Sequence, residues 1–237
     1  MLESSRARIL ESLAADALVL DIGAWARPLA RADWVIDLMP HETRGLYGEA
    51  DPERERFTAG TWVQRDMCDR EPWPFADDQF DFAVCSHTLE DVRDPVWVCE
   101  EINRVAKAGY VEVPARSEEQ TMGIQGPWVG WSHHHWLVDI VDGCVEFVLK
   151  PHLLHGRPEF WVDPGWMASL PPEGRVTSLF WEGSFASRER VFYTPDELHE
   201  YLAGVADRYG APLERTGSAD GTRRPLAAAR RMLRRRG

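Results

Sequence analysis

The stretch that decides the fold is Ala17-Leu18-Val19-Leu20-Asp21-Ile22-Gly23-Ala24-Trp25-Ala26-Arg27-Pro28. Its almost wholly apolar run, 18–22, has no polar alternation, which is typical of a central strand of a parallel sheet. Gly23 then permits a sharp turn and a close ligand approach, and Pro28 bars a regular helix from starting before it. Since ligands in open α/β sheets bind beyond the carboxyl ends of the strands, we expect a site at this turn.

A second apolar run, Trp34-Val35-Ile36-Asp37, ends in an acidic residue. A carboxylate at the end of the second strand accepts hydrogen bonds from both hydroxyls of a ribose. The two strands together therefore predict a cofactor that contains a nucleoside.

The rest of the first half alternates between strand and helix patterns. We expect a leading helix over 3–15, a loop with at most one helical turn over 40–60, strands at 61–66, 80–86 and 110–114, and a helix over 94–106 that Asp94 caps. This alternation is typical of an α/β fold whose parallel sheet is covered by helices.

The chain has 237 residues, a length that suits one α/β domain with an insertion. No apolar run approaches the ~20 residues that a membrane-spanning helix needs. The first six residues lack the apolar core of a signal peptide. We therefore expect a cytoplasmic protein, and we interpret its four cysteines as free buried thiols because none forms a CxxC pair.

The net charge of −12 is unevenly distributed. The last sixteen residues carry seven arginines and no acid, so subtracting these seven charges leaves −19 for the rest of the chain. Such an acidic body argues against a duplex nucleic-acid partner, which requires a basic footprint. The basic tail keeps an RNA substrate open as a disfavoured alternative.

Several segments together resemble a known family: 19–23, 35–37, Asp66-Met67, Pro74-Phe75-Ala76-Asp77-Asp78-Gln79-Phe80-Asp81, and Ser86-His87-Thr88-Leu89-Glu90-Asp91-Val92 followed by Asp94-Pro95. They look like the class I S-adenosylmethionine-dependent methyltransferases, and most like the small-molecule, type 11-like branch. The resemblance covers roughly residues 17–115. It implies a Rossmann-like, mostly parallel seven-stranded sheet flanked by helices.

The resemblance also implies which residues bind the cofactor. The acid and glycine of the first strand and turn contact the amino-acid end, the second-strand acid holds the ribose, the third acid contacts the adenine, and the end of the fourth strand lies near the sulfonium. Carried over to this sequence, these are Asp21, Gly23, Ala24, Asp37, Leu38, Asp66, Met67, Ser86 and His87.

The first loop departs from the family pattern because it lacks two of the usual glycines and contains Trp25. This leaves open a methyltransferase-like module that binds the cofactor without turnover. A nicotinamide-dependent reductase is a weaker alternative, since it would need a second glycine in this loop.

One set of candidate metal ligands follows the fourth strand, and a second is in the histidine-rich segment described next. Members of the family that resemble this chain hold a divalent metal at positions matching His87, Glu90 and Asp91. His, Glu and Asp side chains suit a hard or borderline cation. The alternative, that Glu90 and Asp91 cap backbone groups and neutralise arginines in the loop, is favoured here, so a divalent metal stays possible but is not the favoured interpretation.

The segment Trp131-Ser132-His133-His134-His135-Trp136 follows the fifth strand, close to the expected methyl donor. One of its three histidines is a candidate general base that removes the proton of a hydroxyl acceptor. Two other interpretations remain open. His133 and His135 share one face of an extended segment and bind a transition metal with His152 or His155, or the loop is structural.

The second half is expected to cover the substrate. Runs 136–141 and 144–150, joined by Asp142-Gly143, predict an inserted β-hairpin, and the last strands of the sheet are expected at 175–182 and 187–193. A final helix begins after Thr194. We divide the chain into a cofactor-binding core (1–125), a substrate-covering part (126–213) and a basic tail (214–237) whose contact with a membrane is not favoured.

The sequence thus predicts a methyltransferase that uses S-adenosylmethionine and acts on a small molecule, and the favoured acceptor is a hydroxyl of a sugar or natural product.

Overall fold

A computed structural model describes residues 1–48 and 51–213, so the basic tail lies outside the described residues. Its main sheet has six strands in the order β3-β2-β1-β4-β5-β8. The strands are β1 (Val19–Ile22), β2 (Trp34–Asp37), β3 (Trp62–Gln64), β4 (Phe82–Ser86), β5 (Ala108–Pro114) and β8 (Val176–Glu182). The first five are parallel and β8 is antiparallel to β5. The expected α/β fold with a mostly parallel sheet is confirmed.

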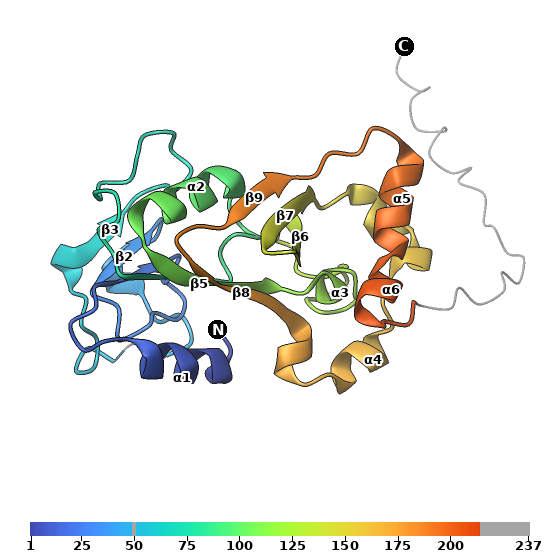
Figure 1. The fold of residues 1–237 in the computed structure, drawn as a ribbon. Coiled ribbons are helices and arrows are strands. Elements are labelled where there is room, and N and C mark those ends of the chain that lie inside the picture. Colours follow the sequence, from blue (N-terminus) through green and yellow to red (C-terminus); the bar gives the residue numbers. More distant parts are fainter. Residues whose placement is uncertain (49–50, 214–237) are drawn as a thin grey trace, which may run out of the picture.

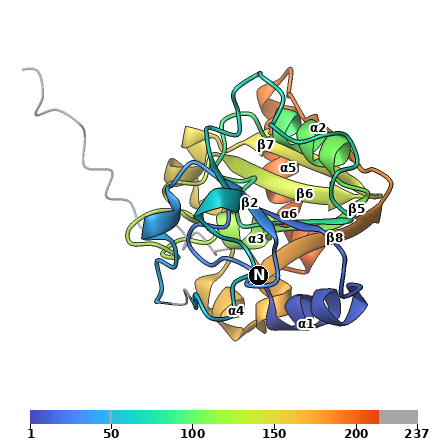
Figure 2. The same cartoon turned by 90° about the vertical axis from the view of Figure 1, so that its left-hand side faces the viewer.

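A different helix lies on each face of this sheet (Figure 1). Helix α1 (Glu3–Ser12) packs Ile9 against Val19 and other side chains of one face, and α2 (Pro95–Val105) lies on the opposite face. Successive strand residues point to opposite faces, so Leu20 and Ile22 belong to the α2 side. Figure 2 shows α1 and α2 on either side of β5 and β8.

Few helices connect the strands of the main sheet. The chain between β1 and β2 contains no helix, as Pro28 predicts, and the chain from β3 to β4 is a loop whose Trp73 and Phe75 fill the core beside α2. Arg104 of α2 donates to the carbonyls of both residues, at 3.1 and 2.7 Å. The loop therefore takes the place of a covering helix.

The second sheet consists of β6 (Trp136–Val141), β7 (Cys144–Leu149) and β9 (Ala186–Glu189). The predicted hairpin of β6 and β7 is confirmed. Its turn residues Asp142 and Gly143 both have positive φ, as a two-residue type I′ turn requires. The largest hydrophobic cluster contains side chains from both sheets, Ile22 and Phe147 among them.

The prediction of seven strands in one sheet was wrong for the described residues. The segment at 187–193 was expected to be its last strand, but β9 pairs in parallel with β7 of the second sheet. The side chain of Asn103, on α2, hydrogen-bonds both backbone groups of Phe185, at 2.8 and 3.0 Å. This contact holds the chain against α2, so that β9 lies away from the edge of β8.

The remaining helices lie around the second sheet (Figure 1). They are α3 (Arg116–Glu119), α4 (Pro164–Ser169), α5 (Pro195–Ala203) and α6 (Val205–Tyr209). Short 3-10 turns lie at His152–Gly156, Pro158–Phe160 and Pro172–Arg175, and two more, at His41–Thr43 and Ala59–Thr61, lie between β2 and β3 of the main sheet. None of the helices in the described ranges has the length and apolarity that crossing a membrane requires.

Candidate functional site

A cavity of about 920 Å³ opens at the carboxyl ends of β1, β2 and β4. Ligands bind at this edge in open α/β sheets. The cavity wall includes every site residue predicted from the sequence: Asp21, Gly23, Ala24, Asp37, Leu38, Asp66, Met67, Ser86, His87, His133, His134 and His135. The strand ends therefore face the same cavity as histidines 133–135 of the segment 131–136, which we call the histidine segment, although the two regions are far apart in the chain.

Gly23 begins the turn after β1 with a φ of +70°. A Cβ at this position would lie 2.7 Å from the Cβ of Thr88, in the loop after β4. Glycine is needed here because the backbone is left-handed and because the Thr88 side chain occupies the adjoining space. The sequence suggested that the missing Cβ makes room for a ligand, whereas the structure shows that Thr88 packs there.

Asp37 holds the loop after β1 against the end of β2. One carboxylate oxygen accepts from the amide of Trp25 and the other from the amide of Met39, both at 2.8 Å. Burial raises the pKa of Asp37, and these hydrogen bonds offset part of that rise. Each oxygen has a further lone pair, so the carboxylate can still accept hydrogen bonds from a ligand.

Asp21 is buried below the same turn and accepts from the amide of Leu29 at 2.7 Å. Burial raises the pKa of Asp21 to about 7, the bond from Leu29 opposes this, and the charge of Asp37 adds to it. The carboxyl therefore changes its charge near neutral pH.

Asp66 follows β3 and faces the cavity beside Met67. It accepts from the amide of Cys68 at 2.9 Å and forms an ion pair with Arg93. Burial acts to raise the pKa of Asp66, but these two partners hold it below its usual value. Arg93 is a cavity residue that the sequence analysis did not identify.

His87 lies at the end of β4 with a φ of +53°, unusual for a residue other than glycine. Its Nε2 is 3.2 Å from Glu112 and its Nδ1 is 3.4 Å from Glu90. Although burial disfavours its charged form, the two carboxylates raise the pKa of His87 to about 9, so it is an imidazolium at neutral pH. Ser86 also donates to Glu112, at 3.2 Å.

The two metal-ligand sets considered from the sequence are not assembled. His87 and Glu90 pair with each other, whereas Asp91 faces the histidine segment. His155 instead accepts from the amide of Val129 at 3.5 Å. Within residues 1–48 and 51–213, the structure brings together one set of three metal-ligating side chains, with ligand atoms all within 4.8 Å: Asp91, His133 and His134.

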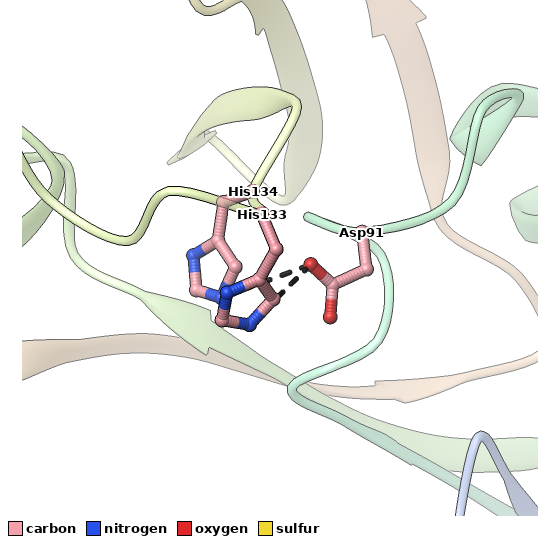
Figure 3. A group of neighbouring side chains, drawn as sticks. All are labelled: Asp91, His133 and His134. Carbon is pink, nitrogen blue, oxygen red and sulfur yellow. Dashed lines mark ion pairs between the residues drawn. The ribbon is translucent and has the colours of Figure 1, made fainter. Parts of the chain in front are cut away.

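This set, which we call the Asp91 cluster, joins the loop after β4 to the segment before β6 (Figure 3). One carboxylate oxygen of Asp91 lies 3.8 Å from Nε2 of His134 and 4.0 Å from Nε2 of His133. The expectation that His133 and His135 share a strand face was wrong. His133 lies in a turn, and it is His134 that converges with it on Asp91.

Glu119, at the end of α3, fixes the orientation of His134. The Nδ1–H of His134 donates to Glu119 at 2.6 Å, and the indole of Trp131 stacks on the imidazole with a centroid separation of 5.7 Å. Lys150 pairs with the other oxygen of Glu119 at 2.8 Å. Neither charged residue was predicted from the sequence as part of the site, because the only signal for Glu119 was a pair of acids after the fifth strand.

The two histidines of the Asp91 cluster have opposite electrostatic environments. Burial lowers the pKa of His133, and the neighbouring His134 adds to this. Burial acts in the same direction on His134, but the hydrogen bond to Glu119 raises its pKa overall. Burial raises the pKa of Asp91 to about 6, against the influence of His134.

Residues 23–111 match the family described as "Methyltransferase domain". This part of the chain is similar to methyltransferase domains. The matched range contains Asp37, Asp66, His87 and Asp91, and the resemblance to class I, type 11-like methyltransferases is confirmed. Histidines 133–135 lie beyond the matched range. A search of curated proteins found no match to the chain.

Solved structures similar to this chain include the YcgJ protein of Bacillus subtilis, at 21% identity over 48% of this chain and 52% of that one, with a TM-score of 0.38. A methyltransferase of Thermotoga maritima, named as a possible histamine N-methyltransferase, is 22% identical over 49% and 52% of the two chains, with a TM-score of 0.33. A complex of a methyltransferase activator and a methyltransferase from Haloferax volcanii is 20% identical over 43% and 46%, with a TM-score of 0.33. The chain thus spans about half the length of these proteins.

Proposed function

We propose that this protein is an S-adenosylmethionine-dependent methyltransferase that acts on a hydroxyl group of a small molecule, such as a sugar or a natural product. One observation carries the proposal: Asp21 and Asp37 at the strand ends face the same cavity as the Asp91 cluster. The cavity thus has one wall suited to a nucleoside cofactor and another suited to proton removal.

The residues of the first wall fit the cofactor. The free lone pairs of Asp37 suit the two ribose hydroxyls, and Asp66 suits the adenine amino group. Leu38, which is 59% exposed, and Met67 supply apolar contacts to the base. Asp21, Gly23 and Ala24 lie at the turn assigned to the amino-acid end, and Ser86 and His87 lie at the end of β4, assigned to the sulfonium.

S-adenosylmethionine supplies an electrophilic methyl group when it is bound. The protein's own part is to orient the acceptor and to remove the proton from its hydroxyl, which we assign to the Asp91 cluster. His135 also lines the cavity. In the described hydrogen bonds it takes part only through its backbone, which donates to the carbonyl of Glu90 and accepts from the amide of Lys150.

The experiment is a turnover assay that detects S-adenosylhomocysteine with a panel of hydroxylated acceptors. We expect His133→Ala to lower turnover by about 10²–10⁴-fold, the usual contribution of a proton-transfer group, with unchanged cofactor affinity. His152→Ala, which removes an exposed histidine outside the cavity wall, is the matched control. Cofactor binding without turnover on any acceptor would instead favour a module that only binds.

A further inference from the structure

We propose that the Asp91 cluster is a binding site for one divalent cation of the zinc class. Two imidazole nitrogens and one carboxylate oxygen are the protein ligands of many catalytic zinc and non-haem iron sites. Such sites use three protein ligands and keep one or more positions open. Here the open positions face the cavity that His133, His134 and Asp91 all line.

The Asp91 cluster contains a buried polar atom without a partner. The Oδ1 atom of Asp91 is buried and has no hydrogen-bond partner, although two imidazole nitrogens lie 3.8 and 4.0 Å away. These separations are too long for hydrogen bonds. They are close to those of two ligand atoms bound to one ion through bonds of about 2.0–2.2 Å. Small rotations of His133, whose side chain is 53% exposed, bring its Nε2 into range.

Glu119 orients His134 as a metal ligand would be oriented. The Nδ1–H of His134 donates to Glu119 at 2.6 Å, which leaves the lone pair of Nε2 directed at the side of Asp91. A carboxylate on the far nitrogen of a ligating histidine is the usual outer contact of metal sites, where it fixes the ring and its tautomer. Lys150 neutralises Glu119 at 2.8 Å, so this carboxylate is already satisfied without a cation.

A second unsatisfied carboxyl group adjoins the cluster. Glu90, the residue before Asp91, is 1% exposed, and neither of its side-chain oxygens has a hydrogen-bond partner. His87 lies 3.4 Å from Glu90 and 3.2 Å from Glu112, and the N-terminal ammonium also lies 3.3 Å from Glu112. Glu90 and Asp91 thus both have acceptor oxygens without partners beside the two imidazoles, a donor set that suits a cation.

A cation at this place would bind the acceptor oxygen. With a cation bound, the Asp91 cluster would promote loss of the acceptor proton by lowering the pKa of the coordinated hydroxyl, instead of accepting the proton itself, and the proton would pass to solvent water at the open side of the cavity. This role rests on the proposed function and specifies its acceptor class, namely small molecules with an oxygen that can bind a metal. Cation binding itself does not depend on methyl transfer.

The test uses the full chain, freed of metal by a chelator and titrated with Co²⁺ followed by visible absorption and with Zn²⁺ by calorimetry. We expect one site per chain. Glu119→Gln should weaken binding by about 10–100-fold, the usual effect of losing an outer partner, and His133→Ala and Asp91→Ala by at least as much. His135→Ala, a neighbouring histidine of the same cavity wall outside the cluster, should bind as the unmodified protein does.

Absence of a one-to-one site in the unmodified protein, or equal affinity in His133→Ala and the unmodified protein, would overturn the proposal. His133 is exposed, so its variant is expected to fold even if Asp91→Ala does not. Titration with S-adenosylhomocysteine in the same samples separates the two claims. Cofactor binding without cation binding refutes only the cation site, and cation binding without cofactor binding refutes only the proposed function.

Discussion

The imidazolium of His87 lies 3.2 Å from the carboxylate of Glu112, so the end of β4 is joined to the middle of β5 by a charge pair whose carboxylate is buried. Glu112 also accepts from the hydroxyl of Tyr110 at 2.5 Å. Burial opposes the charge of Glu112, but these donors hold its pKa near 2. The pair therefore links His87, which lines the cavity, to Glu112 in β5 of the main sheet.

The pH dependence of stability follows from this pair. The pKa of Glu112 falls from 4.5 to about 2 on folding, so its contribution is present above pH 4.5 and is lost as the pH falls toward 2. The pKa of His87 rises from 6.5 to about 9, so its contribution is present below pH 6.5 and is lost as the pH rises toward 9. Stabilisation by the pair should be greatest between pH 4.5 and 6.5.

Denaturant unfolding of His87→Asn checks this. Asparagine tolerates the left-handed backbone of this position. We expect a loss of about 1–2 kcal/mol near pH 5.5 and a smaller loss at pH 9.5, the magnitude being reduced because solvent screens the half-exposed imidazole. The control variant His152→Asn, which changes an exposed histidine, should lose no stability at either pH. A loss in His87→Asn that does not vary with pH would contradict the charge pair.

Gly23→Ala should destabilise the protein through two effects. The φ of +70° strains any residue with a Cβ, and that Cβ would overlap Thr88. Gly183→Ala is the matched control, because Gly183 has a φ of +74° and nothing lies within 4 Å of a Cβ built there. We expect about 1 kcal/mol for the control and about 2–4 kcal/mol for Gly23→Ala, measured by denaturant unfolding. Equal losses in the free energy of unfolding of the two variants would show that Thr88 moves away from the added Cβ without an energetic cost.

Cofactor affinity should depend on the ionisation of Asp21. If this carboxylate contacts the ammonium of the amino-acid end, S-adenosylhomocysteine should bind several-fold more tightly at pH 8 than at pH 6, since the pKa of Asp21 is about 7 in the free protein. Asp21→Asn keeps an acceptor for Leu29 and should remove the difference. The same pH profile in both proteins, measured by calorimetry, would argue against this contact.

The sequence predicts the parts of the site that arise from local patterns. The apolar run ending at Gly23 and the acid closing the second strand place two carboxylates at one edge of the sheet, where the structure has them. The Asp142-Gly143 pair predicts its turn because few other residues adopt two consecutive positive φ angles.

The sequence does not predict contacts that depend on the tertiary fold. Asp91 and His134 are separated by more than forty positions, and their approach depends on the route of the loop after β4 past the segment before β6. Glu119 was missed for the same reason, and the position of β9 depends on Asn103 of another element. Histidines 133–135 could be proposed as a group, but which of them converge follows only from the turn at His133.

Calorimetric titration of S-adenosylhomocysteine into the unmodified protein and into Asp37→Ala measures whether Asp37 binds the ribose of an adenosine cofactor. We predict one site in the unmodified protein and affinity weaker by about 1–3 kcal/mol in the variant, the cost of lost charge-assisted hydrogen bonds. Circular dichroism of Asp37→Ala verifies that the loop held by this carboxylate has not unfolded the domain. Equal affinity in the two folded proteins, or no binding to the unmodified one, would contradict the account.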